Sequence, residues 1–172
     1  MQEKTVNDVI EELRMQGIVL SLSNACRLIN NAVSELTTMY DNSIVPTELE
    51  ISAEAGEPYM LETMGIKSIK HNGMPYTSYK ADSQSITFDH SGDFQATVVM
   101  IPDDVSAKDD DIPVHTAFHP AVIQYVAYHA QPIGPDGKPK DNEMFYAMAQ
   151  SVNSRLSRTK YKGIKMPARV WR

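Results

Sequence analysis

Hydrophobic residues recur every three or four positions over the first forty residues, a spacing typical of amphipathic helices. The first stripe consists of Val6, Val9, Ile10 and Leu13. Thr5 and Asp8 resemble a capping signature at the start of this stripe, and Gly17 is placed to end the helix. The second stripe, which Ser21 or Ser23 can cap, consists of Cys26, Ile29, Val33, Leu36 and Tyr40. We therefore predict two helices within residues 5–40.

The period changes between residues 45 and 101, where apolar and polar side chains begin to alternate. Leu49, Ile51 and Ala53 alternate with polar residues, which predicts a strand with one solvated face. Asn72-Gly73 is a strong signal for a two-residue hairpin, because both turn positions need a positive φ. Residues 65–70 keep no strict period of two and form a weaker strand candidate. We expect an antiparallel sheet of about five or six strands here.

Helical periodicity returns in the last third of the chain. His119-Pro120 opens a third helix, with proline at a position that the first turn tolerates. Residues 131–140 are rich in proline and glycine and predict an exposed connection. A fourth helix is expected from about Asp141 to about Tyr161, before Gly163 and Pro167 stop it.

Together these patterns predict an α+β fold. A bundle of about four helices carries an antiparallel β-sheet inserted between helices 2 and 3, and an extended C-terminal tail follows. We assign residues 1–162 to a single domain, with helices at 5–40, the β insertion at 45–101 and helices at 119–162. Residues 163–172 form the tail. A chain of 172 residues is long enough for one such domain.

Composition excludes several classes of protein. No apolar run approaches the roughly 20 residues that a membrane span needs. Residues 1–20 lack the basic start and apolar core of a signal peptide. The single cysteine, Cys26, cannot form an intrachain disulfide and falls on the apolar stripe of the second helix, so we expect it in the core.

Positive charge is collected at the C-terminal end of an acidic chain. The whole sequence has 16 basic and 22 acidic residues and a net charge of −6, but the last eighteen residues have no acidic residue. Their seven basic residues are Arg155, Arg158, Lys160, Lys162, Lys165, Arg169 and Arg172. Such asymmetry indicates that this end contacts something negative: nucleic acid, an acidic partner or the acidic face of another copy. A solvated last helical turn with a frayed end is the alternative.

The motifs that suggest chemistry do not form an active site. His115 and His119 have the spacing of a metal pair, but Pro120 should push His119 away from helical angles. No glycine-flanked serine accompanies the Asp89-His90 pair. An acidic loop lacks the register of a calcium loop and is expected to be solvated; its members are Asp103, Asp104, Asp109, Asp110 and Asp111. We predict no catalytic residue, no metal site and no cofactor.

Several segments resemble the head-to-tail adaptor (connector or neck) proteins of tailed bacteriophages. The segments are Gly73–Tyr76, Asp82–Phe88, Gly92–Met100, His119–Ala130 and Phe145–Leu156. An N-terminal helical segment precedes the β insertion in that family too, so the likeness covers most of the chain. Its motifs are patterns of apolar and small residues rather than catalytic signatures.

The resemblance implies a structural virion protein at the neck, present in the host cytoplasm during assembly. Twelve copies would form a ring that docks on the portal protein, links it to a tail or nozzle protein and forms part of the DNA channel. DNA would pass without specific binding, past acidic walls to which the five-aspartate loop could contribute. The tail would dock on the portal through Lys165, Met166, Arg169, Val170, Trp171 and Arg172, with Trp171 as the anchor. Alternatively, Trp171 folds back onto its own domain.

Two other functions compete with this interpretation. The chain could be a nucleic-acid-binding module, with Arg155, Arg158, Lys160 and Lys162 making electrostatic contacts. Its negative net charge argues against that reading. It could also be an enzyme with an unrecognised site near His90 or His115.

Overall fold

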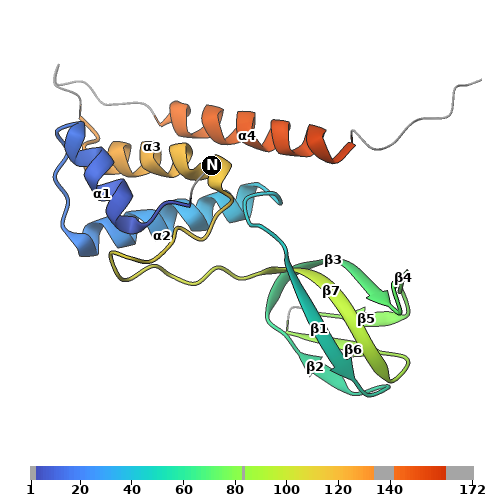
Figure 1. The fold of residues 1–172 in the computed structure, drawn as a ribbon. Coiled ribbons are helices and arrows are strands. Elements are labelled where there is room, and N and C mark those ends of the chain that lie inside the picture. The colour runs from blue at the N-terminus through green and yellow to red at the C-terminus, as the bar shows by residue number, and fades with distance from the viewer. Residues whose placement is uncertain (1–2, 83, 134–141, 162–172) are drawn as a thin grey trace, which may run out of the picture. The chain divides into compact units, whose positions relative to one another are not determined.

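The computed structural model describes residues 3–82, 84–133 and 142–161 of the chain (Figure 1). Its internal contacts divide the chain into two compact units. Among the described residues, 3–43, 104–133 and 142–161 make up the helical unit, and 44–82 and 84–103 make up the β unit. The β unit is inserted between the second and third helices, and the α+β class predicted from the sequence is confirmed. The predicted tail, residues 163–172, lies outside the described residues.

Local capping sets the bounds of the first two helices. Helix α1, Val6–Met15, begins at a capping box in which Thr5 and Asp8 bond to each other's backbone N–H. It ends with Gly17 at φ +80°, whose N–H donates to the carbonyl of Arg14, as predicted for a glycine-terminated helix. Helix α2, Leu22–Met39, is capped by Ser21, which settles the choice between the two candidate serines.

Helix α3, His119–Ala130, is the central helix of the helical unit. It follows directly on a 3₁₀ turn, Thr116–Phe118, and its buried side chains surround most of its circumference. It packs against α1 and α2 and, on another face, against α4, Glu143–Tyr161 (Figure 1). A helix that is apolar nearly all round belongs inside a bundle rather than at its surface. Phe118 and Phe145 are fully buried in this core, and Cys26 is 6% exposed, as expected.

The described residues of the β unit form seven antiparallel strands in two sheets, where we expected one sheet of five or six. The strands are β1 Thr47–Ala53, β2 Pro58–Met60, β3 Thr63–His71, β4 Met74–Pro75, β5 Tyr79–Ala81, β6 Ser85–Phe88 and β7 Gly92–Met100. One sheet has the order β1-β7-β3-β4 and the other β2-β6-β5. Strands of two or three residues are too short to show a period, which explains the miscount.

One core joins the two sheets of the β unit. Phe88 of β6 stacks on Phe94 of β7, with ring centroids 4.0 Å apart and an interplanar angle of 17°. Ile51 and Ile69 add apolar surface from β1 and β3. Because this cluster is built only from residues of the β unit, the insertion has a hydrophobic core of its own.

The weak and strong strand signals both have a structural explanation. Asn72 and Gly73 adopt φ +50° and +76° and join β3 to β4, so the predicted hairpin is confirmed. Strand β3 pairs with β7 through two register shifts, between Thr63 and Gly65 and between Ile66 and Ser68. Each irregularity moves the following side chains off strict alternation, which is why residues 65–70 lacked a period of two.

Candidate functional site

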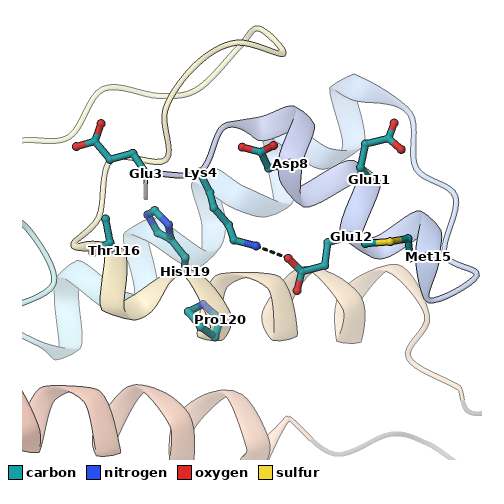
Figure 2. A pocket seen from close by; sticks show the side chains of 9 residues that line it. All are labelled: Glu3, Lys4, Asp8, Glu11, Glu12, Met15, Thr116, His119 and Pro120. Carbon is teal, nitrogen blue, oxygen red and sulfur yellow. Dashed lines mark hydrogen bonds and ion pairs between the residues drawn. The ribbon is translucent and has the colours of Figure 1, made fainter. Parts of the chain in front are cut away.

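A groove of about 500 Å³ lies within the helical unit, between α1 and the start of α3 (Figure 2). Four carboxylates and one ammonium group line it. Its lining residues are Glu3, Lys4, Asp8, Glu11, Glu12, Met15, Thr116, His119 and Pro120. The carboxylates come from the N-terminal segment and from α1, whereas the floor comes from α3 and the turn before it. The groove is therefore predominantly acidic and is formed by segments more than 100 residues apart in the sequence.

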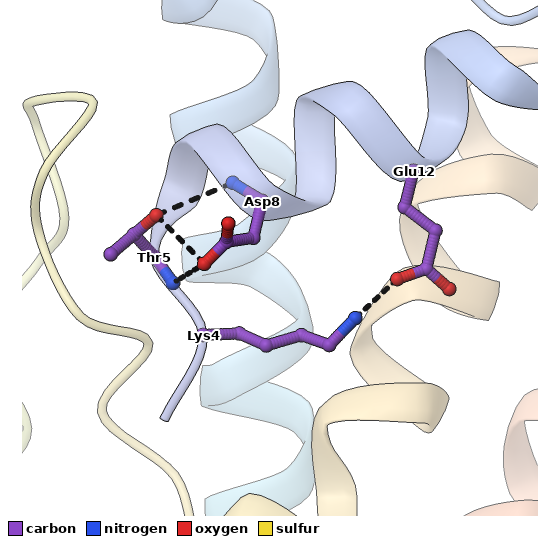
Figure 3. Close-up of polar contacts among 4 residues, drawn as sticks. All are labelled: Lys4, Thr5, Asp8 and Glu12. Carbon is purple, nitrogen blue, oxygen red and sulfur yellow. Dashed lines mark hydrogen bonds and ion pairs between the residues drawn. The ribbon is translucent and has the colours of Figure 1, made fainter. Parts of the chain in front are cut away.

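Polar contacts within two pairs of residues, Thr5 with Asp8 and Lys4 with Glu12, hold the α1 side of the groove in place (Figure 3). The carboxylate of Asp8 accepts from the Thr5 backbone N–H at 2.9 Å, and that bond is the main reason why the pKa of Asp8 lies below its ordinary value. The Lys4 ammonium forms an ion pair with Glu12, which lies one turn beyond Asp8 on α1. Asp8 is accordingly ionised at neutral pH, and Lys4 offsets only part of the negative charge.

His119 forms the buried floor of the groove and is 2% exposed. Its ring rises from the first turn of α3 toward the segment that carries Glu3 and Lys4 (Figure 2). Burial lowers the pKa of His119, and hydrogen bonds from the ring to the backbone of Val114 and Ile112 offset part of that effect. The neutral ring is therefore the stable form at neutral pH.

One nitrogen of this ring has no hydrogen-bond partner. Nε2 of His119 is buried and unpaired among the described residues. Since the backbone carbonyls of Val114 and Ile112 accept from the ring, the donating nitrogen is Nδ1. In the neutral ring the unpaired Nε2 is then an acceptor, which is costly to bury without a donor.

The prediction that Pro120 keeps His119 out of helical geometry is wrong. His119 has φ −52° and ψ −41°, because the 3₁₀ turn leads straight into α3 and the His119 N–H donates to Thr116. It is His115, with ψ 130°, that lies outside the helix, so the two imidazoles do not share a helical face. Nδ1 of His115 instead accepts from the Ala117 N–H at 3.1 Å. In the part of the chain that the structure describes, no group of three His, Cys, Asp or Glu side chains is placed to hold a metal ion.

The five-aspartate loop is less solvated than expected. Asp103, Asp104, Asp109 and Asp111 are exposed, but Asp110 is partly buried and organises the loop. Its carboxylate accepts from the N–H groups of Ser106 and Ala107 at 2.7 and 2.8 Å, and these bonds lower its pKa. The pattern of charge alone gave no sign of this role, because it does not record which backbone N–H groups a carboxylate can reach.

The same loop is fastened to α1 and α2. The Val6 N–H donates to the carbonyl of Asp110 at 3.0 Å, next to an isolated bridge between Thr5 and Asp111. The side chain of Asn30 bonds both the N–H and the carbonyl of Val105, at 2.9 and 3.1 Å. Residues 104–111 of the loop are thus a fixed part of the helical unit and support the N-terminal edge of the groove.

The basic residues predicted to make electrostatic contacts are only partly described. Arg155 and Arg158 are exposed near the end of α4, where i, i+3 spacing puts them on one face. Lys160 belongs to the last turn of α4. Lys162 and the predicted docking residues Lys165, Met166, Arg169, Val170, Trp171 and Arg172 lie outside the described residues.

The remaining histidine proposed for an enzyme site has a structural contact. Nδ1 of His90 lies 3.3 Å from the Tyr76 hydroxyl, and the two rings meet edge to face at the exposed end of the β unit. The sequence analysis missed a different polar cluster in the helical unit, where Tyr146 of α4 donates to Glu35 of α2 at 2.5 Å. No sequence pattern links these two residues, because only tertiary packing brings their helices together.

No protein-family model matches the chain, and no curated protein matches it. Within the described ranges, none of the helices is both long and apolar enough to cross a membrane.

Proposed function

We propose that the chain is a head-to-tail adaptor of a tailed bacteriophage: a structural virion protein that forms a ring of twelve copies, docks on the portal and connects it to a tail or nozzle protein. The observation that carries the proposal is the topology. An antiparallel β unit with its own core is inserted between α2 and α3 of a four-helix unit, which is the arrangement that the sequence resemblance implies.

The polar groups of the helical unit support a structural role. The hydrogen bonds of Asp8 cap a helix, and those of Asp110 and Asn30 hold the backbone of a loop. Histidines that could have served an enzyme bond to backbone or to tyrosine. In this proposal the exposed acidic residues face solvent or the DNA channel, where they would let the duplex slide without adhering.

Docking of the tail on the portal tests the proposal. Deletion of residues 163–172 should abolish co-sedimentation with purified portal rings, because Trp171 and its basic neighbours would supply the anchor. Circular dichroism should show an unchanged helical signal, and substitution of Trp171 by Ala should weaken docking in the same direction. Portal binding that survives the deletion would contradict the docking role of the tail.

A nucleic-acid-binding module is the second candidate, favoured by the exposed Arg155 and Arg158 at the end of α4. It requires DNA binding by the isolated protein, with affinity that falls steeply with salt. Fluorescence anisotropy with a labelled duplex at about 50 mM and about 200 mM salt separates the two functions. The adaptor proposal expects no measurable binding at either concentration.

A further inference from the structure

The groove between α1 and α3 has the charge of a site for a cationic partner. Among the described residues Glu3 and Asp8 face it without an ion pair of their own, whereas Glu12 is paired with Lys4 and Glu11 with Arg14 at 3.5 Å. Asp8 cannot relieve the repulsion by taking up a proton at neutral pH, because the Thr5 backbone N–H stabilises its charged form. A lysine or arginine side chain entering the groove would reduce this repulsion.

The unpaired Nε2 of His119 is the second, independent sign of a ligand. It is a buried acceptor on the floor of the groove with no donor among the described residues. Lysine and arginine side chains carry only donors, so such a side chain has the chemistry to bond both an acceptor nitrogen and a carboxylate.

The end of α4 has the matching chemistry. Residues 155–162 include four basic residues and no acidic one, and the described pair Arg155 and Arg158 is exposed on one helical face. Helix α4 packs on α3, and the groove opens on the α1 side of α3 (Figure 2). The basic end of α4 would have to pass around α3 to reach the groove of its own copy. The groove of another copy is open to it without that detour.

We propose that the acidic groove of one copy binds the basic end of α4, residues 155–162, of a second copy. This inference rests on the proposed function, because it supplies the contact between neighbours in the ring. Residues 163–172 then remain available for docking on the portal. A contact that joins two different surfaces is heterologous, so it repeats from copy to copy and closes only as a ring.

Two variants each remove one side of this contact. The groove variant combines Glu3→Gln with Glu11→Gln, which spares the helix cap and the Lys4–Glu12 pair and breaks only the exposed Arg14–Glu11 pair. The basic-end variant combines Arg158→Gln, Lys160→Gln and Lys162→Gln. The charge-matched controls are Asp104→Asn with Asp109→Asn, and Lys67→Gln with Lys70→Gln and Lys80→Gln, all at exposed positions outside the groove.

Sedimentation velocity of each full-length protein, alone and mixed, is the measurement. Wild type and both controls should self-associate, more weakly at high salt, and each variant should lose about tenfold or more in association constant. An equimolar mixture of the two variants should form heterodimers and nothing larger, because one intact groove meets one intact basic end.

Three results would overturn the inference: variants that associate like wild type, controls that lose association equally, or a mixture that stays monomeric. A mixture would also stay monomeric if α4 docked on the groove of its own copy, because mixing the two variants cannot restore a contact within one copy. Portal docking by the wild type is scored separately, so a failed contact between copies leaves the adaptor proposal standing.

Discussion

At the scale of single residues, Glu35 of α2 connects its own helix to two others. Its carboxylate accepts from Tyr146 on α4 and also hydrogen-bonds Tyr125 on α3, so one side chain links three helices. The phenol rings belong to a set of aromatic contacts at the α3–α4 junction, where Tyr125 lies 5.0 Å from Phe145. A charged acceptor strengthens a hydrogen bond and favours the protonated phenol.

The first prediction concerns the titration of Tyr146. Hydrogen bonding to Glu35 raises the pKa of Tyr146 to about 12. This folded-state pKa lies above the ordinary value of 10.0. The contact therefore stabilises the folded state fully below pH 10, and its contribution to the free energy of unfolding is lost as the pH rises through about 12. Glu35→Gln should bring the pKa of Tyr146 back toward 10.0.

Phenolate absorbance, recorded as the difference between each protein and its Tyr146→Phe counterpart, isolates this one tyrosine. Glu48→Gln, an exposed substitution in the β unit, is the control and should leave the difference curve unchanged. An unchanged curve for Glu35→Gln would show that the hydrogen bond does not set the pKa of Tyr146.

At the scale of elements, the sequence predicted best where local chemistry decides. The stripes and caps of α1 and α2 and the Asn72-Gly73 hairpin follow from spacing and turn preferences, and they were found in the expected places. Failures occurred where the hydrogen bonding of the backbone, rather than the spacing of side chains, decides. The turn around Asp110 and the helical angles of His119 depend on neighbours that no periodicity records.

A prediction for the acidic loop follows from its attachment to α2. Asn30→Ala removes both bonds to Val105 and leaves a partly buried N–H and carbonyl unpaired, which should lower the free energy of unfolding by about 1–3 kcal/mol. Chemical denaturation followed by circular dichroism measures the loss. Asn31→Ala, one position away and exposed, is the matched control and should stay within about 0.5 kcal/mol of wild type. Equal losses for both variants would contradict the attachment.

A prediction for the β unit concerns the start of β7. A Cβ on Gly92, which has φ +155°, would lie 2.8 Å from Cε1 of His71. Gly92→Ala should therefore displace His71 from its 2.9 Å contact with the Asp93 carbonyl and from the Phe94 ring, at a cost of about 1–3 kcal/mol.

Hydrogen exchange over residues 44–103 reports this cost within the β unit. The control is Gly65→Ala in β3, where an added Cβ meets no atom within 4 Å, so exchange should change little. Faster exchange for Gly65→Ala than for Gly92→Ala would contradict the role assigned to Gly92.

At the scale of the whole molecule, the sequence predicted the order of helices and strands but not the groove. Helix α1 and His119 are separated by more than 100 residues, and only packing of α1 on α3 brings the carboxylates above the imidazole. The basic end of the chain, by contrast, was visible from composition alone. The proposed adaptor would use both, with the groove and residues 155–162 between copies and residues 163–172 toward the portal.

Copy number in the particle tests the adaptor proposal most directly. Quantitative mass spectrometry of purified virions of the phage that encodes this chain, with isotope-labelled peptides of the chain and of the portal subunit, gives the ratio of the two proteins. We predict a ratio of one, as expected for a ring of twelve adaptors on a portal of twelve subunits. Absence of the chain from the particle would contradict the account.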